Sequence, residues 1–300
     1  MSGVVGRFAP TPSGRMHLGN AFAYLLAWLS ARSKGGEIIL RMEDLDTLRC
    51  TPAFAGEIRQ DLTWLGLDWD RETPPQRERT DAYEKALKLL QGKTNVFPCW
   101  CTRGSLNLIG APHASDGHPI HPAACRLRSE EERSKMIGAP AWRLEAPDLT
   151  VCFRDGVYGE YSENLARNCG DFVLRRADGV FVYQLAVVVD DGEAGVTEVV
   201  RGCDLLSSTP RQIYLSRLLG YPEMQYWHVP MLTDAGGRKL SKRDADLDLG
   251  ALRLNHRPEE VVGMLAFRAG LLEREEPVSP RELLSVFRWD KLRREDIPIG

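Results

Sequence analysis

The chain has 300 residues, 43% of them hydrophobic, and its 39 basic and 42 acidic residues leave a formal net charge of −3. This composition can bury a large core in one or two domains, and the charge excludes a polycation that attracts nucleic acid as a whole. No apolar run approaches the roughly 18–20 residues that a membrane span needs. Met1-Ser2-Gly3 leads straight into a predicted strand, so we expect no signal peptide, no membrane contact and a cytoplasmic location.

The first part of the chain predicts a βαβ unit. Residues 4–8 and 37–42 are predicted strands, and residues 17–33 carry apolar side chains at helical spacing. The second strand has three consecutive apolar residues, which is typical of a strand covered on both faces. The strands should be parallel, with their ligand at their carboxyl ends, where His17 and Glu43 lie.

The middle and the end of the chain predict further elements around an irregular insertion. Thr51-Pro52 predicts a helix start, with Thr as N-cap and Pro at the first helical position. That helix ends near residue 65, and a second covers residues 80–90. Residues 96–128 accumulate Cys, His, Pro and Gly without periodicity, which indicates an insertion. Strands are predicted at 141–144, 149–154, 171–176 and 180–189, the last two joined by an Asp178-Gly179 hairpin turn. Helices are predicted at 209–219, 247–252, 258–269 and 280–286.

Two short motifs together predict an ATP site. Residues 12–20 read Pro-Ser-Gly-Arg-Met-His-Leu-Gly-Asn, and residues 237–244 read Gly-Arg-Lys-Leu-Ser-Lys-Arg-Asp. His17 and Asn20 are one helical turn apart, at a helix N-terminus that favours phosphate. Lys239 and Lys242 suit a clamp on the β- and γ-phosphates. Either motif alone is more typical of a helix cap or a solvated basic turn, and their joint occurrence favours the ATP site.

These motifs resemble the His-x-Gly-His and Lys-Met-Ser-Lys-Ser signatures of class I aminoacyl-tRNA synthetases. Residues 7–14 resemble the Arg-x-Ala-Pro-Ser-Pro-Thr-Gly opening of glutamyl-tRNA synthetases, and residues 40–46 their Leu-Arg-Ile-Glu-Asp-Thr-Asp. The match covers nearly the whole chain and ends where those enzymes begin their anticodon-binding domain. In length, motif order and cysteine positions the chain resembles the shortened glutamyl-Q tRNA(Asp) synthetases. It departs from the signatures at Asn20 and Leu240 and from the opening at Thr11, and each change keeps the physical role.

The resemblance implies an α/β fold: a Rossmann-like class I synthetase catalytic domain with an inserted zinc-binding subdomain and a short helical C-terminal region. We expect catalytic halves at 1–95 and 141–236, the insertion at 96–140, the motif loop with a helical region at 237–300, and no anticodon-binding domain. The implied activity joins L-glutamate to ATP, with Mg²⁺, as glutamyl-adenylate. Glutamate then passes to the queuosine base in the anticodon of tRNA(Asp). We expect a monomer.

The resemblance also implies roles for individual residues. Arg7 and Arg201 would hold the side-chain carboxylate of glutamate, because the guanidinium fork matches a carboxylate. Glu43 would meet the α-ammonium group, and Tyr183 would line the site. Further glutamate-site residues are Phe8, Ala9, Pro10 and Thr11. The ATP-site residues are His17, Gly19, Asn20, Lys239, Ser241 and Lys242, of which His17, Asn20, Lys239 and Lys242 would be catalytic. Without the resemblance, Arg201 and Tyr183 are more typical of structural residues, an ion pair and a half-buried strand aromatic.

The insertion predicts a metal site. Cys99-x-Cys101 and His121-x-x-x-Cys125 offer three thiolates and one imidazole, a set that suits one tetrahedral structural Zn²⁺ with no open position. His121 occupies the place of a tyrosine that is often the third ligand in the family. His113 and His118 remain alternatives to it, and so does a loop of free cysteines.

Three interpretations remain open at this point. Residues 288–294 form a basic cluster that is either a solvated helix end or a contact with the tRNA backbone. The chain could instead be a compact glutamyl-tRNA synthetase that charges tRNA(Glu). It could also be a catalytically silent tRNA-binding paralogue, although the intact His17, Lys239 and Lys242 argue against that.

Overall fold

A computed structural model describes residues 3–299 except 109–116, 118–119, 235 and 238–247. The strands are β1 (Val5–Phe8), β2 (Glu37–Leu40), β3 (Arg71–Glu72), β4 (Val96–Cys99), β5 (Ala141–Leu144), β6 (Thr150–Asp155), β7 (Gly159–Asn164), β8 (Phe172–Arg175), β9 (Glu198–Gly202), β10 (Gln225–Val229), β11 (Leu232–Thr233) and β12 (Ile297–Pro298). The α-helices are α1 (Leu18–Arg32), α2 (Pro52–Trp64), α3 (Thr80–Lys93), α4 (Arg103–Leu108), α5 (Glu130–Ser134), α6 (Tyr183–Ala194), α7 (Thr209–Leu219), α8 (Leu249–Asn255), α9 (Pro258–Ala269) and α10 (Pro280–Leu283).

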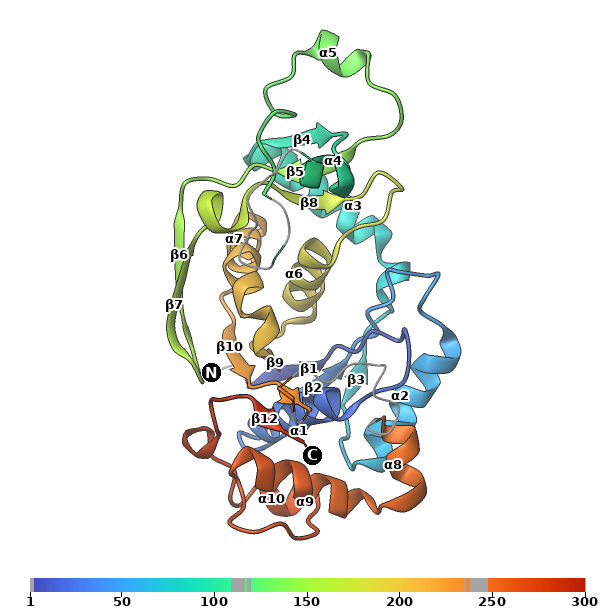
Figure 1. The fold of residues 1–300 in the computed structure, drawn as a ribbon, viewed down its shortest axis with the longest axis vertical. Helices are drawn as coiled ribbons and strands as arrows, with labels where there is room; N and C mark the ends of the chain where they lie inside the picture. Colours follow the sequence, from blue (N-terminus) through green and yellow to red (C-terminus); the bar gives the residue numbers. More distant parts are fainter. Residues whose placement is uncertain (1–2, 109–116, 118–119, 235, 238–247, 300) are drawn as a thin grey trace.

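Parallel strands form the centre of the molecule (Figure 1). β1 pairs with β2 and β2 with β3, while β10 pairs with β9 and β6, all in parallel. β1 lies beside the start of β9, where Thr197 N–H donates to the Val5 carbonyl at 2.9 Å. The predicted βαβ unit of β1, α1 and β2 is therefore confirmed, and the central sheet has the expected Rossmann-like α/β arrangement.

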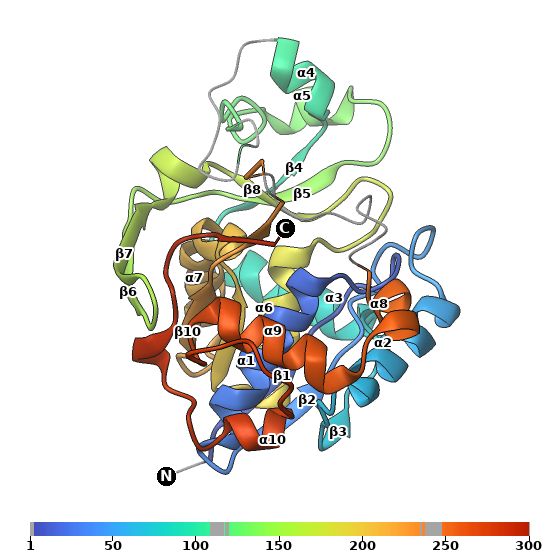
Figure 2. The same ribbon diagram turned by 60° about the horizontal axis from the view of Figure 1, so that its bottom comes forward.

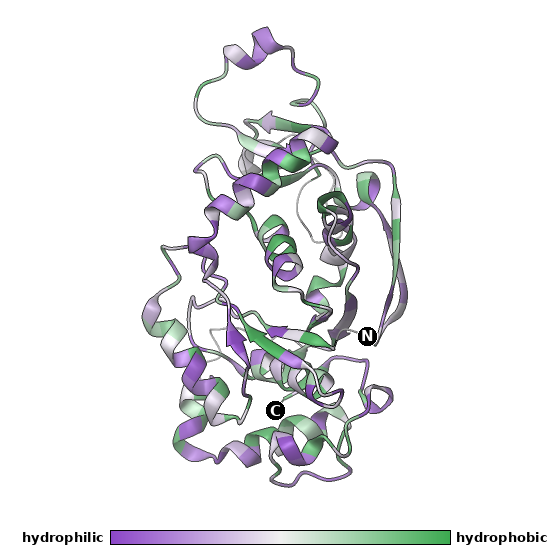
Figure 3. Ribbon diagram, turned by 180° about the vertical axis from the view of Figure 1, so that it is seen from behind, coloured by the Kyte–Doolittle hydropathy of each residue, from purple (hydrophilic) through white to green (hydrophobic). Residues whose placement is uncertain are grey.

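Helices cover both faces of this sheet, which explains the continuous apolar run in β2. Ile38 and Leu40 join the core formed with α1, α9 and α10, whereas Ile39 joins Ile213 of α7 on the other face. Figures 1 and 2 show α9 and α10, in orange and red, on the α1 side of the sheet, and α6 and α7 on the opposite side. In Figure 3 the central strands carry both hydrophobic and hydrophilic residues; β2 is mostly hydrophobic after Glu37, whereas β3 is hydrophilic.

A smaller lobe extends from one end of the molecule (Figure 1). Its sheet is antiparallel, in the order β4-β5-β8, and β4 pairs with β5 from Val96 opposite Leu144 to Cys99 opposite Ala141. The hydrophilic helix α5 lies at its tip (Figure 3). The lobe has a small buried core of its own, made by Phe97, Cys99 and Cys125, so the insertion holds together around its cysteines.

The predicted strand at 180–189 is wrong. The Asp178-Gly179 turn exists, with Gly179 at φ 88°, but pairing stops after one bridge between Arg175 and Phe181. The chain then enters α6, whose apolar residues are buried against α3 and α7. A helix buried on most sides carries an apolar run that resembles a strand, and β-branched Val187–Val189 strengthens that resemblance. Tyr183 consequently begins a helix and does not lie in a strand.

The last part of the chain packs back onto the sheet. α9 agrees with its predicted bounds, whereas α10 ends at Leu283, three residues before the predicted end. In the basic cluster at 288–294, Trp289 stacks on Trp227 with ring centroids 4.4 Å apart, and exposed Arg288 pairs with Asp290 at 2.7 Å. The tRNA contact stays a prediction. No helix among the described residues has the length and apolar character needed to cross a membrane.

Candidate active site and metal centre

The first motif caps the helix that it begins. His17 is the N-cap residue of α1: its Nδ1 accepts from Gly19 N–H at 3.1 Å, and its own N–H donates to Asn20 Oδ1 at 3.4 Å. Because Nδ1 accepts, the neutral ring carries its proton on Nε2, which makes Nε2 a donor. A Cβ at position 19 would lie 3.0 Å from the His17 imidazole, so a glycine at this position avoids a steric clash with the ring. Donors at a helix N-terminus suit a phosphate.

The second motif lies mostly outside the described residues. Its predicted site residues there are Lys239, Ser241 and Lys242. Its carboxyl-terminal flank is described: Asp248 forms an antiparallel bridge with His17, and Leu249 N–H donates to the Met16 carbonyl at 2.9 Å. The residues that follow the second motif, from Asp248 on, therefore lie beside the first motif.

A group of buried charged side chains, the arginine cluster, lies at the carboxyl ends of β1, β2 and β9. Its members are Arg7, Arg41, Glu43, Asp191 and Arg201. Arg41 donates to Asp191 Oδ1 at 2.5 Å and to Glu43 Oε1 at 3.0 Å. Arg7 Nε lies 3.5 Å from Asp191 Oδ2. Asp191 thus partners two guanidinium groups, and Arg41 holds Glu43.

Residues 8–11 lie against the same cluster, as expected. Arg41 N–H donates to the Phe8 carbonyl and Glu43 N–H to the Pro10 carbonyl, each at 2.9 Å. Phe8 is fully buried and Thr11 is exposed. Ala9 lies between them, so residues 8–11 run alongside Glu43.

Asp190 fixes the helix that carries Asp191. It accepts from Arg79 Nε at 2.5 Å, from Gln76 Nε2 at 2.8 Å and from the Tyr83 hydroxyl at 2.9 Å. These partners come from the turn at 76–79 and from α3, so they hold α6 against that turn and α3. A buried charge requires such compensation.

Arg201 differs from the other arginines because its partners are neutral. Its Nε donates to His228 Nε2 at 3.1 Å, its Nη2 to Thr209 Oγ1 at 2.8 Å and its Nη1 to the Tyr183 hydroxyl at 3.3 Å. A weaker contact joins Nη2 to the Leu205 carbonyl at 3.5 Å. Among the described residues no carboxylate lies at ion-pair distance from Arg201. Its charge is available to an anionic ligand.

The electrostatics join the predicted residues into one site. Burial raises the pKa of the Tyr183 hydroxyl. The nearby Arg201 charge opposes this rise, and the Glu43 charge adds to it. Burial also raises the pKa of Glu43, although the Arg41 guanidinium opposes that rise. Burial and then Glu43 raise the pKa of Tyr24, a residue of α1 that the sequence did not point to. The charge of Glu43 is therefore close enough to interact with the hydroxyl groups of Tyr24 and Tyr183, and the charge of Arg201 interacts with the hydroxyl group of Tyr183.

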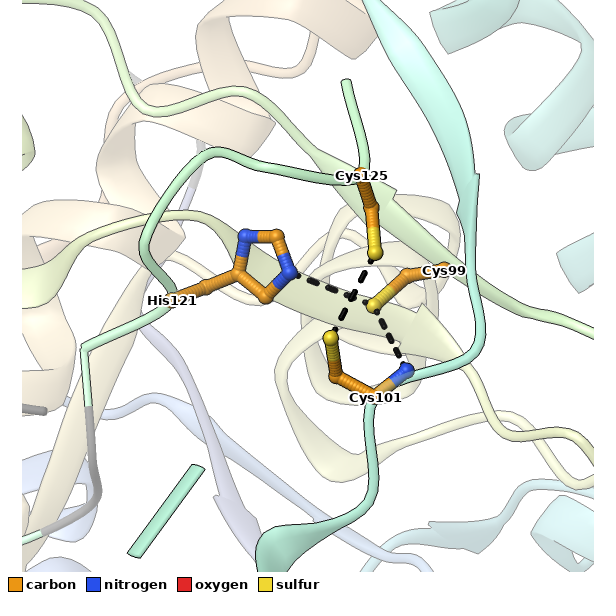
Figure 4. A group of neighbouring side chains, drawn as sticks. All are labelled: Cys99, Cys101, His121 and Cys125. Carbon is orange, nitrogen blue, oxygen red and sulfur yellow. Dashed lines mark hydrogen bonds between the residues drawn. The ribbon is translucent and has the colours of Figure 1, made fainter. Parts of the chain in front are cut away.

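The four predicted metal ligands also meet (Figure 4). The ligand atoms of Cys99, Cys101, His121 and Cys125 all lie within 4.8 Å of one another. Cys99 Sγ is 3.3 Å from His121 Nε2, and Cys101 Sγ is 3.4 Å from Cys125 Sγ. Zn–S bonds of about 2.3 Å in a tetrahedron place sulfurs roughly 3.8 Å apart, so the set fits zinc. The alternatives His113 and His118 lie outside the described residues.

The protonation of the cluster also suits a metal. Burial opposes ionisation of Cys99, but its hydrogen bond with His121 lowers the pKa to about 6. Burial and the adjacent sulfurs raise the pKa of Cys101 to about 12. Nδ1 of His121 lies 3.4 Å from Asp171 Oδ2, the carboxylate contact that orients many zinc-binding histidines. A metal ion would replace the protons that these groups otherwise share.

Several residues of the site were not predicted. They are Tyr24, Arg41, Asp155, Asp171, Asp190, Asp191 and His228. Arg41 lies inside the motif at residues 40–46, and Asp190-Asp191 interrupts the apolar sequence of α6. Both features could have indicated site residues. Asp155 and His228 meet only through the pairing of β6 with β10, which the sequence did not indicate.

A surface pocket lies elsewhere, at the amino ends of β1 and β2. Val5, Gly36, Glu37 and Thr197 help to line it. It contains none of the predicted site residues, and ligands in this class of fold gather at the opposite ends of the strands. We assign it no role.

Comparison with known proteins gives one consistent result. Residues 3–287 match the family described as tRNA synthetases class I (E and Q), catalytic domain. The chain is 46% identical to the glutamyl-Q tRNA(Asp) synthetase of Nitratidesulfovibrio vulgaris, over 94% of this chain and 91% of that protein. It is 46% identical to that of Symbiobacterium thermophilum, over 98% and 95%. The crystal structure of glutamate-tRNA synthetase from Elizabethkingia anophelis matches with a TM-score of 0.86 and 27% identity, over 100% of this chain and 68% of that chain.

Proposed function

The chain belongs to the glutamyl-Q tRNA(Asp) synthetases, within the class I tRNA synthetases for E and Q, and we propose from this that it is a glutamate-activating ligase. It activates L-glutamate with ATP and transfers it to the queuosine base in the anticodon of tRNA(Asp). The observation that carries the glutamate assignment is Arg201, a buried guanidinium with neutral partners that meets Tyr183. Such a group favours an anionic side chain over its amide.

The first step needs charge stabilisation and positioning. The α-carboxylate of glutamate attacks the α-phosphorus of ATP, and pyrophosphate leaves; Mg²⁺ bound with ATP would balance part of the phosphate charge. Glu43 holds the α-ammonium group, and Arg7 and Arg201 hold the side-chain carboxylate, with Tyr183 and residues 8–11 as walls. His17, Gly19 and Asn20 receive the phosphates at the N-terminus of α1. Lys239, Ser241 and Lys242 clamp the leaving pyrophosphate.

The second step is transfer. A nucleophilic oxygen of queuosine attacks the carbonyl carbon of glutamyl-adenylate, an ester forms and AMP leaves. In our proposal the catalytic halves are residues 1–95 and 141–236, the insertion is 96–140, and the motif loop with its helical region is 237–300. We also propose that the protein acts as a monomer in the cytoplasm.

The metal in this proposal is structural. Cys99, Cys101, His121 and Cys125 would hold one Zn²⁺, and a closed four-ligand site supplies stability rather than chemistry. Ala123, between two of these ligands, has φ 60°, which costs a non-glycine residue of the order of 1–2 kcal/mol. A metal ion bound by His121 and Cys125, which flank Ala123, would hold that turn in place.

Transfer of labelled glutamate tests the proposal. We expect label on tRNA(Asp) that carries queuosine and none on the same tRNA made without it. Label on tRNA(Glu) instead would favour a compact glutamyl-tRNA synthetase. Absence of label on every tRNA, together with absence of glutamate-dependent ATP–pyrophosphate exchange, would contradict an enzymatic role.

A further inference from the structure

Arg201 and His228 are neighbours across two parallel strands. They are directly paired in the register of β9 and β10, and His228 is fully buried. Arg201 Nε can only donate, so His228 Nε2 accepts its hydrogen bond of 3.1 Å. The proton of the neutral imidazole is therefore on Nδ1.

Asp155 fixes this tautomer. Its Oδ2 lies 2.6 Å from His228 Nδ1 and also accepts from the His228 backbone N–H at 3.1 Å. Its Oδ1 accepts from the backbone N–H groups of Val157 and Tyr158, each at 2.9 Å. Asp155 is itself buried at the end of β6. Four donors thus hold the carboxylate, and the carboxylate holds the ring.

Thr209 completes the orientation of the guanidinium. Its hydroxyl accepts from Arg201 Nη2 at 2.8 Å. The same hydroxyl lies 3.1 Å from His228 Nε2 and 3.3 Å from the Leu205 carbonyl, and it can donate to either of these acceptors. Within the described part of the chain, Nη1 has a single partner, the Tyr183 hydroxyl. Nη1 carries two N–H groups, so one is left for a ligand on the Tyr183 side.

The imidazole orients Arg201 without neutralising it. Burial lowers the pKa of His228 to about 4, although its bond to Asp155 opposes that change. The ring is therefore neutral at physiological pH. A carboxylate in direct contact with Arg201 would orient it equally well, but would cancel the charge that distinguishes glutamate from glutamine. The imidazole of His228 lies between Asp155 and Arg201, so the carboxylate orients the guanidinium through the ring and does not touch it.

We propose that His228, held in one tautomer by Asp155, is a positioning residue that aims the uncompensated Arg201 guanidinium at the side-chain carboxylate of the amino-acid substrate. The pair thereby sets the selectivity for glutamate over glutamine. This inference rests on the proposed function, since it assumes that glutamate is the amino acid activated.

Two substitutions at His228 separate its two hydrogen bonds. The amide nitrogen of His228→Asn can replace Nδ1 toward Asp155, but the side chain ends short of Arg201. His228→Gln places an amide oxygen near the position of Nε2, so it can still accept from Arg201. Purified full-length protein is assayed by ATP–pyrophosphate exchange with glutamate and with glutamine, and its thermal unfolding is recorded.

We expect His228→Asn to raise KM for glutamate about 10- to 100-fold, as expected for a lost hydrogen bond to a charged group. KM for ATP and kcat should stay within about threefold, because the bond acts on Arg201 and not on phosphate. The preference for glutamate over glutamine should fall with the change in KM. His228→Gln should recover most of both losses.

Several results would overturn the inference. An unchanged KM for glutamate in folded His228→Asn would do so, as would equal losses for ATP and glutamate, or equal losses in the Asn and Gln variants. If His228→Asn does not fold, Thr209→Val removes the bond to Arg201 Nη2 together with the contact to His228 Nε2, and it should raise KM for glutamate but not for ATP. An unchanged KM for glutamate in Thr209→Val would also contradict the inference. Wild-type protein without glutamate-dependent exchange would refute the proposed function itself, whereas normal wild-type exchange with unaffected variants refutes only the role of His228.

Discussion

The two sides of the proposed glutamate site hold buried guanidinium groups under opposite electrostatic conditions. On the β1–β2 side, Arg7 and Arg41 share the carboxylate of Asp191, and Arg41 also holds Glu43. On the β9–β10 side, Arg201 meets an imidazole and two hydroxyl groups. The difference teaches that a buried arginine held by two acids, as Arg41 is by Asp191 and Glu43, has a structural role. Where its partners are neutral, it is prepared for a ligand.

Replacing Arg41 tests the compensated side and should have the largest effect. Arg41→Met leaves Glu43 buried without its cation and Asp191 with Arg7 alone, and breaking buried pairs in this way costs about 3–5 kcal/mol of unfolding free energy. Urea denaturation measures the loss. Arg201→Met is the matched control and should lose far less, because it strands no carboxylate. Equal losses in the two variants would remove the distinction between the two sides.

Replacing Arg201 tests the uncompensated side. Arg201→Ala should lower kcat/KM for glutamate about 100- to 1000-fold, since truncating one partner of a buried charge pair costs about 2–5 kcal/mol. KM for ATP should hardly change, and both constants follow from ATP–pyrophosphate exchange. Arg201→Lys keeps the charge without the planar guanidinium fork, so its kcat/KM for glutamate should lie between the values of the wild type and Arg201→Ala. A comparable loss of ATP binding would indicate a structural role.

The pH dependence of stability tests the neutral imidazole beside Arg201. His228 has a pKa of about 4 when folded and about 6.5 when unfolded. Between these values the unfolded chain binds the extra proton, so stability is full above pH 6.5 and is lost as pH falls toward 4. Asp155 stays charged throughout, because its pKa is lowered by the bond to His228 despite burial. Denaturation at pH 7 and pH 4.5 should show a smaller decrease in His228→Asn than in wild type; identical decreases would mean that His228 does not titrate there.

The zinc site should affect the glutamate site least. Cys125→Ala removes one of four ligands, so metal content measured by atomic emission should fall from one zinc per chain toward zero. The insertion should lose stability, while KM for glutamate stays within about twofold. A large rise in KM would mean that the insertion shapes the glutamate site directly.

The sequence predicted most of the helices and strands, because these depend on local pattern. The βαβ unit, the Thr51 cap and the meeting of the four metal ligands were all indicated by spacing or residue type. The helix at Tyr183 was missed because periodicity cannot separate a short apolar strand from a buried helix. The supports of Arg201 were missed for another reason. Asp155 and His228 are 73 residues apart and meet only through strand pairing.

ATP–pyrophosphate exchange by the wild-type protein, with glutamate or glutamine and without tRNA, tests the central claim most directly. An uncompensated Arg201 predicts exchange with glutamate and at least a hundredfold lower kcat/KM with glutamine, about the cost of leaving a buried charge without its partner. Comparable exchange with both amino acids, or exchange with glutamine alone, would contradict the assignment of Arg201 to the side-chain carboxylate.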